Sequence, residues 1–265
     1  MTRLCCLSLI EGLASYVPIH AQPKDPPKHF TNSLGMKFVW ISPGNFMMGS
    51  PKEEKERDAN ETQHKVTLTK GFYMGVHLVT QEQWQAVMGK NPSHFKGEKT
   101  LPVENVTWED CQEFIKKLRE KDKNPYRLPT ESEWEYSCRA GTKTPFHFGE
   151  TIFTDQANYN GNHTYGNGKK GKDRKKTTPV GSFPANAWGL FDTHGNLWEW
   201  CQDWLGDYPQ NDVADPQGPN EGQYRVLRGG SGVNSPLTCR SACRHRLEPG
   251  FRGNVIGLRV CFCLD

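Results

Sequence analysis

The sequence has little of what defines several common fold classes. Long runs of helix-favouring residues are scarce, and no segment after the first residues is long and apolar enough to span a bilayer. We find no internal repeat and no sharp change of composition across the 265 residues, so one domain is the simplest organisation. The chain is instead rich in glycine (26), proline (18) and tryptophan (8). This balance predicts a loop-rich α+β fold with short helices, and argues against a helical bundle or a doubly wound α/β sheet.

A strong charge of one sign is also missing, because the formal net charge is only +3. Residues 169–176 alone carry more positive charge than that. Glycines lie beside this stretch, so we interpret it as a solvated loop. No aromatic platform or basic face accompanies it in the sequence, and we therefore expect no nucleic-acid partner.

The first 31 residues are interpreted as a leader or linker, with the domain at 32–265. Arg3 precedes the apolar stretch 4–10, and residues 19–21 resemble an imperfect signal-cleavage site, but Glu11 interrupts the apolar run. A signal peptide, with export or surface attachment, and a plain leader on a cytoplasmic protein both stay open. Residues 22–31 are rich in proline and lysine, which predicts a linker.

The nine cysteines are odd in number and scattered, and they lack the paired CxxC spacing of a structural zinc site. Cys5 and Cys6 belong to the leader. Elsewhere two alternatives stay open: a disulfide such as Cys201 to Cys239 if the protein is exported, or simple burial if it is cytosolic.

Three short helices are predicted by the same capping pattern. Thr80, Thr107 and Thr130 each stand three positions before an acid or an amide, which is typical of a capping box. In the second helix Cys111 shares one face with apolar residues and is predicted to be a small core residue. Gly141 is predicted to end the third helix.

Strand signals lie on both sides of a long loop at 141–184. Residues 38–41 and 44–49 suggest a hairpin, 64–69 a further strand, and 224–228 and 256–262 two more. This order is compatible with pairing between the first and last strands.

Five motifs, in this order, resemble the family of formylglycine-generating enzymes and sulfatase-modifying factors. They are Pro-Gly-Asn-Phe-Met-Met-Gly-Ser at 43–50, Pro-Val-Glu-Asn-Val-Thr-Trp at 102–108, Arg-Leu-Pro-Thr-Glu-Ser-Glu-Trp-Glu at 127–135, Gly-Asn-Leu-Trp-Glu-Trp at 195–200 and Arg-Gly-Gly-Ser at 228–231. The resemblance covers nearly all of the chain after the leader. It implies a C-type-lectin-like fold with small antiparallel sheets, often with bound calcium.

A calcium site is expected at the turn before the fourth motif. Calcium prefers hard oxygen ligands, and Asp192 and Glu199 bracket this turn. The resemblance adds the carbonyl oxygens of Gly195 and Leu197. The alternative is that the two acids cap the turn or pair with arginines.

The resemblance also implies an enzymatic alternative, the copper-dependent oxidation of a substrate cysteine to formylglycine. Family members with this activity hold copper(I) with two cysteines after Arg-Gly-Gly-Ser, and thiolates suit this soft cation. In this chain Asn234 stands where the first cysteine is expected and Cys239 where the second is expected. Cys243 could form a rearranged pair with Cys239, and Ser231 and Trp198 match family positions near the reaction centre.

The stretch 231–255 mixes two kinds of residue without helix or strand periodicity. Family-like positions (Asn234, Cys239, Arg240, Ser241, Arg244, Arg246, Arg252, Asn254 and, just beyond, Gly257) alternate with an arbitrary set. That second set consists of Val233, Ser235, Thr238, Cys243, His245, Leu247, Phe251, Gly253 and Val255. Each of these can be reached from an asparagine codon by changing its adenines, as in the variable proteins of diversity-generating retroelements.

Our first hypothesis is therefore a binding module that displays the second set to a protein or cell-surface ligand. The formylglycine-generating oxidase is the second hypothesis. A non-catalytic accessory domain with a fixed partner is the third. The sequence leaves the oligomeric state and the ligand open.

Overall fold

The computed structural model describes residues 26–264, so the question of a signal peptide lies outside the described residues. The three predicted helices are confirmed: α1 is Gln81–Met88, α2 is Trp108–Asp122 and α3 is Glu131–Arg139. Each begins with the expected capping box, in which the threonine and the residue three positions later exchange side-chain and backbone hydrogen bonds. None of the helices within residues 26–264 is long and apolar enough to cross a membrane.

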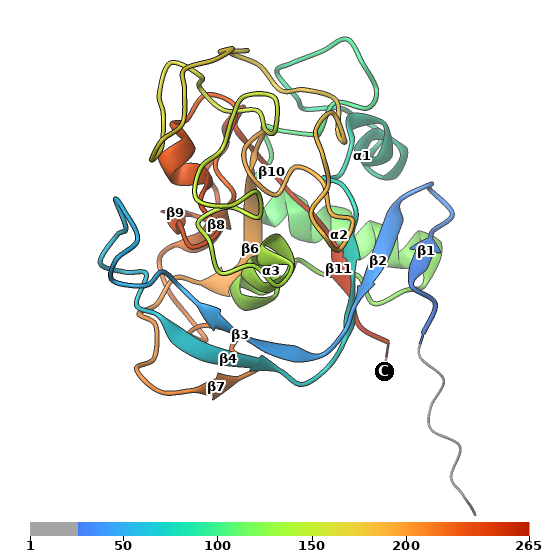
Figure 1. Ribbon diagram of the computed structural model, residues 1–265. Helices are drawn as coiled ribbons and strands as arrows, with labels where there is room; N and C mark the ends of the chain where they lie inside the picture. The colour runs from blue at the N-terminus through green and yellow to red at the C-terminus, as the bar shows by residue number, and fades with distance from the viewer. Residues whose placement is uncertain (1–25, 265) are drawn as a thin grey trace, which may run out of the picture.

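Within residues 26–264, eleven short strands form three small sheets (Figure 1). The first contains, in spatial order, β1 (His29–Thr31), β2 (Lys37–Ile41), β5 (Phe72–Gly75) and β11 (Cys261–Phe262). The second contains β10 (Ile256–Gly257), β6 (Trp198–Trp204), β8 (Arg225–Arg228) and β9 (His245–Leu247). The third contains β3 (Gly44–Met48), β4 (His64–Leu68) and β7 (Val213–Ala214). Most pairs are antiparallel, while β10–β6 and β4–β7 are parallel, and the whole is the expected loop-rich α+β fold.

The strand pairing corrects one predicted hairpin and one predicted boundary. The predicted hairpin between 38–41 and 44–49 is wrong, because β2 pairs with β1 and β5 whereas β3 pairs with β4. In Figure 1, β3 leads on from β2 instead of folding back against it. His29–Thr31, which we assigned to the linker, form β1 at the edge of the first sheet.

The strand predicted at 256–262 is two strands in two different sheets. β10 pairs with β6, and after Leu258 to Val260 the chain enters the first sheet as β11 beside β5. The first and last predicted strands thus share a sheet with β5 between them. Arg259 lies between the two strands, where it is buried and paired with Glu199 of β6.

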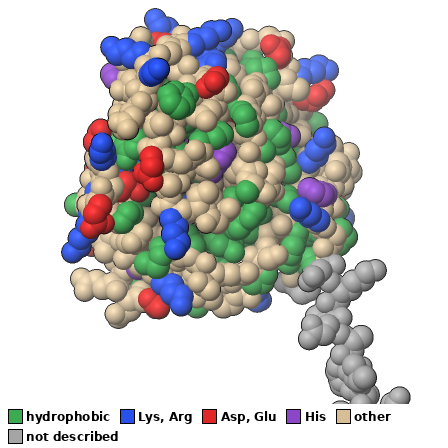
Figure 2. Space-filling view, in the orientation of Figure 1, with side chains coloured by type: hydrophobic (Ala, Val, Ile, Leu, Met, Phe, Trp, Pro, Cys, Tyr) green, Lys and Arg blue, Asp and Glu red, His purple; other side chains and the backbone are tan. Residues whose placement is uncertain are grey.

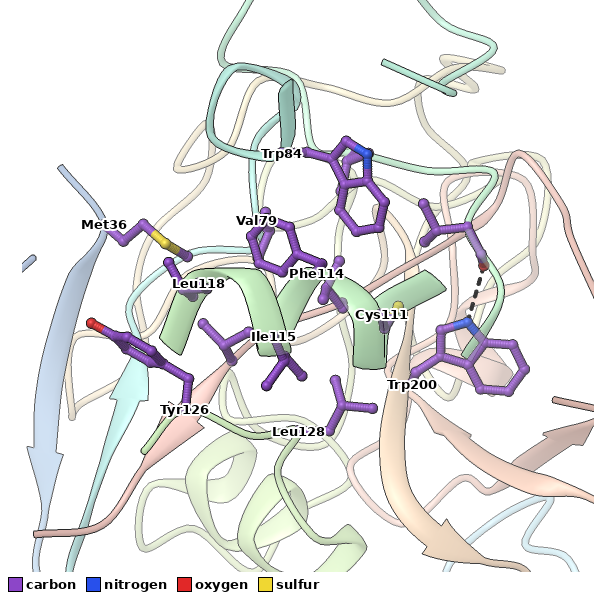
Figure 3. Close-up of a cluster of buried hydrophobic side chains, with 14 of the residues drawn as sticks. Met36, Val79, Trp84, Cys111, Phe114, Ile115, Leu118, Tyr126, Leu128 and Trp200 are labelled. Atoms are coloured by element: carbon purple, nitrogen blue, oxygen red, sulfur yellow. Dashed lines mark hydrogen bonds between the residues drawn. The ribbon is translucent and has the colours of Figure 1, made fainter. Parts of the chain in front are cut away.

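The largest core cluster forms around α2 (Figure 3). Phe114 stacks on Trp84 of α1 with ring centroids 4.9 Å apart, and Cys111 is fully buried as predicted. Trp200 of β6 donates its indole N–H to the Val106 carbonyl oxygen at 3.2 Å, the hydrogen bond drawn in Figure 3. The core therefore anchors β6, the strand on which the C-terminal stretch rests.

Candidate functional site

Trp198, the first residue of β6, holds three separate parts of the stretch 231–255 together. Its indole N–H donates to the side-chain oxygen of Asn234 at 3.0 Å. Its backbone N–H donates to the Val255 carbonyl oxygen at 2.9 Å, and its ring lies 4.9 Å from that of His245. Trp198 is only 5% exposed, so the three segments that contact it are packed against the core.

Eight of the nine positions in the arbitrary set reach the surface above this support. Val233 and Phe251 are 43% and 46% exposed, and His245 is exposed as well. The others are half-buried: Ser235, Thr238, Leu247, Gly253 and Val255. We call these eight residues the C-terminal patch.

Cys243 is the exception, and its prediction as a contact residue is wrong. Its side chain is 4% exposed and packs in the main core cluster. Nothing in the sequence separated it from its neighbours, because this part of the chain has no regular periodicity. Burial also raises the pKa of its thiol to about 12.

Four arginines within or next to the stretch 231–255 are buried in ion pairs. Arg244 makes two hydrogen bonds with Glu131 of α3, at 2.7 and 2.8 Å. The other three follow the same scheme: Arg228 pairs with Glu135, Arg240 with Glu54 and Glu61, and Arg259 with Glu199. A buried charge is tolerated only when it is paired in this way. Arg240 and Arg244 thus connect the stretch 231–255 to the loop before β4 and to α3. Arg259, just beyond the stretch, is connected to β6.

The sequence analysis did not identify the buried glutamates that pair with these arginines. Glu131 and Glu135 lie one helical turn apart, a spacing that also fits an exposed charged face, so the pattern alone did not reveal burial. Of the nine family-like positions, Cys239, Arg240, Ser241, Arg244 and Gly257 are buried, Asn234 is half-buried, and Arg246, Arg252 and Asn254 are exposed. Burial in this part of the chain thus follows the two sets only in part.

At the predicted calcium turn the contacts match the alternative in which an acid pairs with an arginine. Both carboxylate oxygens of Glu199 accept from Arg259, and one also accepts from the Trp134 indole N–H. Asp192 accepts from the backbone N–H of Gly181, and burial raises the pKa of its carboxyl to about 6.

Two backbone carbonyl oxygens were predicted as metal ligands at this turn. One of them, that of Gly195, already accepts a hydrogen bond from the N–H of Leu197. Of the two predicted carboxylate ligands, Glu199 is already paired with Arg259, so only the carboxylate of Asp192 is free of an ion pair. Calcium here stays a prediction.

The residues of the oxidase alternative are only partly brought together. Ser231 and Trp198 both donate to the side-chain oxygen of Asn234, so an amide stands where the resemblance expects a thiolate. Cys239 is buried in a different apolar cluster from Cys243. All seven cysteines within the described residues are free thiols, so the alternative of a disulfide from Cys201 to Cys239 is wrong.

The buried side chain of His194 links Cys239, in the stretch 231–255, to the backbone of His147. Its Nδ1 lies 2.7 Å from the Cys239 carbonyl oxygen, while its Nε2 lies 3.0 Å from the backbone nitrogen of His147. The backbone N–H must donate to Nε2 and Nδ1 must then donate to the carbonyl, which requires the neutral ring. Burial holds the pKa of His194 well below its usual value and lowers that of His147 to about 4.

We therefore expect both imidazoles to stay neutral at pH 5.5 in the folded protein. Unfolded histidines bind a proton below about pH 6.5, so the unfolded state takes up protons that these folded histidines refuse. Their contribution to stability is thus complete above about pH 7 and is lost as the pH falls towards 4. Nitrogen-resolved NMR of the imidazoles tests the first statement, and an imidazolium signal from His194 at pH 5.5 would contradict it.

Comparison with known proteins agrees with the motifs. The sulfatase-modifying factor enzyme 1-like domain matches residues 23–262. The chain belongs to this family. Among curated relatives, it is 32% identical to the serine/threonine-protein kinase pkn1 of Chlamydia caviae over 93% of this chain, and 32% identical to the formylglycine-generating enzyme of Streptomyces coelicolor over 63% of it. The chain spans only 40% and 54% of the lengths of these two relatives. Their activities therefore cannot be assigned to this chain from the similarity alone.

A solved family-like structure is similar over almost the whole chain. Treponema denticola variable protein 1 has a TM-score of 0.77 and 28% sequence identity, covering 90% of this chain and 100% of that one. The family fold and a variable-protein-like structure are therefore established together.

Proposed function

We propose that this protein binds a macromolecular ligand through the C-terminal patch, and that the patch is diversified by a retroelement. The observation that supports this most is the separation of roles within one stretch of chain. Arg240 and Arg244 are buried in ion pairs, while neighbouring positions such as Val233, His245 and Phe251 reach solvent. A rigid frame of this kind lets surface residues change without unfolding the domain.

The likeness to Treponema denticola variable protein 1 supports the same proposal, since that protein's name describes it as variable. Formylglycine formation has less support, because Asn234 replaces the first expected cysteine and accepts hydrogen bonds from Ser231 and Trp198. A non-catalytic domain with a fixed partner differs from our proposal only in lacking diversification.

The DNA around the coding sequence tests diversification directly. We expect a near-repeat of the last hundred or so bases beside a reverse-transcriptase gene, with asparagine codons at the patch positions. A neighbourhood without such a repeat would leave the fixed-partner alternative in place.

The tolerance of the patch is tested on the protein itself. We expect Val233→Asn, His245→Asn and Phe251→Asn each to change the free energy of unfolding by less than about 0.5 kcal/mol, as is usual for surface positions. Cys243→Asn, a matched change at the buried position of the same set, should cost several-fold more because it buries an amide. Urea unfolding measures both, and an equal cost at exposed and buried positions would contradict the proposed division.

A further inference from the structure

The basic loop 169–176 borders the C-terminal patch. Asn160 forms an antiparallel bridge with Asp173 of this loop, and its backbone N–H donates to the carbonyl oxygen of Asn234, the residue after Val233, at 2.9 Å. On the other side of Val233, a Cβ placed on Gly232 would lie 3.3 Å from the Lys176 carbonyl oxygen. Val233 therefore sits between two contacts to the same loop region.

The loop is held in place by its backbone and its neighbours. The Gly171 N–H donates to the Gly161 carbonyl oxygen at 2.8 Å, and the side chain of Asn162 donates to Asp173 at 3.0 Å. Arg174 donates to the Thr154 carbonyl oxygen at 2.7 Å and lies over the ring of Phe183. An ordered loop presents its charges without the entropy loss of ordering them on binding.

Five lysines on this loop are exposed and carry uncompensated charge. They are Lys169, Lys170, Lys172, Lys175 and Lys176. Within residues 26–264 the lysines that form ion pairs are Lys99 and Lys117, so none of the five is neutralised by a described acid. Figure 2 shows basic side chains gathered along the upper edge of the molecule, where Figure 1 draws this loop above the short 3-10 helix η1 (Pro236–Cys239).

We propose that the ligand of the C-terminal patch is an acidic protein surface, whose carboxylates lie over the lysine loop while its apolar side chains contact Val233 and Phe251. This inference rests on the proposed function. Clustered charge of one sign speeds encounter with a partner of the opposite sign and selects against others. Val233 next to this loop and Phe251 elsewhere in the patch are both exposed, and aromatic side chains such as Phe251 are enriched in protein interfaces. A purely electrostatic ligand would leave these side chains without a partner.

The test uses a labelled peptide of repeated Glu-Glu-Trp-Gly units as the acidic and apolar probe. A single-stranded oligodeoxynucleotide of equal charge and vesicles of phosphatidylglycerol serve as rival anions. Binding to the full chain is measured by fluorescence anisotropy for the peptide and oligonucleotide and by co-sedimentation for the vesicles. The loop variant changes all five lysines to glutamine, and the patch variant combines Val233→Ser with Phe251→Ser.

The matched control makes the same change of net charge elsewhere. It carries Lys28→Gln, Lys37→Gln, Lys70→Gln, Lys121→Gln and Lys123→Gln, which are exposed lysines just before β1, on β2, shortly after β4 and at the end of α2. We expect the loop variant and the patch variant each to weaken peptide binding at least about tenfold, and the control variant to change it less than about twofold.

The outcomes separate this inference from the proposed function. Peptide binding that depends on the patch but not on the five lysines would overturn the acidic ligand and leave the patch as a binding surface. Binding that depends on the lysines alone would overturn the shared surface. Tighter binding of the oligonucleotide or the vesicles, or no binding of the peptide, would also overturn the inference.

Discussion

Replacing Arg240 by alanine is expected to lower the free energy of unfolding by about 3–5 kcal/mol at pH 7, because it leaves buried carboxylates without their partner. Arg240 is fully buried and donates to both oxygens of Glu61, at 2.7 and 2.8 Å, and to Glu54 at 2.6 Å. It also donates to the Glu56 carbonyl oxygen, so one side chain fastens the loop before β4 to the C-terminal stretch.

The loss should be smaller at low pH. Burial would raise the pKa of Glu61, but the hydrogen bonds and charge of Arg240 outweigh it, so this pKa lies below its usual value. A carboxylate with a lowered folded pKa contributes stability above its unfolded pKa, and this contribution is lost as the pH falls through the folded pKa. The difference between wild type and Arg240→Ala should therefore hold from pH 7 down to about pH 5 and shrink as the pH falls below about 4.3, the usual pKa of an unfolded glutamate.

The control is Arg246→Ala, six residues further along the chain. Arg246 is exposed and lies 5.8 Å from the ring centroid of Tyr224, so we expect a change within about 0.5 kcal/mol. Urea unfolding of the three proteins measures these differences. Equal effects of the two arginines would contradict a buried frame beneath an exposed patch.

Replacing Trp198 by alanine is expected to lower the free energy of unfolding by about 3–5 kcal/mol, the usual cost of deleting a large buried aromatic side chain. The loss should also loosen the patch, since the indole supports Asn234 and His245. Hydrogen exchange should therefore accelerate at 232–235 and 245–247 more than in α2.

Trp198→Phe separates packing from hydrogen bonding. Phenylalanine keeps an aromatic ring beside His245 but cannot donate to Asn234, so we expect a loss of about 1 kcal/mol. If Trp198→Ala instead cost less than about 1 kcal/mol and left exchange unchanged, Trp198 would not be the support that its contacts indicate.

Local signals in the sequence predicted local structure well. The capping boxes at Thr80, Thr107 and Thr130 depend on residues three positions apart, and all three helices begin where expected. Strand pairing depends on distant segments, which is why the hairpin of 38–41 with 44–49 was wrong although both strands exist. The split of 256–262 between two sheets depended on the buried partner of Arg259, which periodicity does not reveal.

The candidate site followed the same rule. The contrast between family-like and arbitrary residues located the exposed patch, because it reflects what a surface tolerates. It failed at Cys243, whose burial depends on the neighbouring core, and at the family-like positions Arg246, Arg252 and Asn254, which are exposed. The approach of the basic loop region to the residues on either side of Val233 was equally hidden, since these segments lie far apart in sequence and only the fold joins them.

The division of 256–262 into β10 and β11 has a consequence for how such a patch can vary. These residues follow the patch and supply strands to two different sheets, together with the partner of Glu199. A chain cut short within the patch would lack both strands, so two sheet edges would be unpaired and the buried carboxylate of Glu199 would lose its arginine partner. We expect such truncated products to misfold and to be cleared by proteolysis, so that the fold itself keeps only variants whose reading frame is intact.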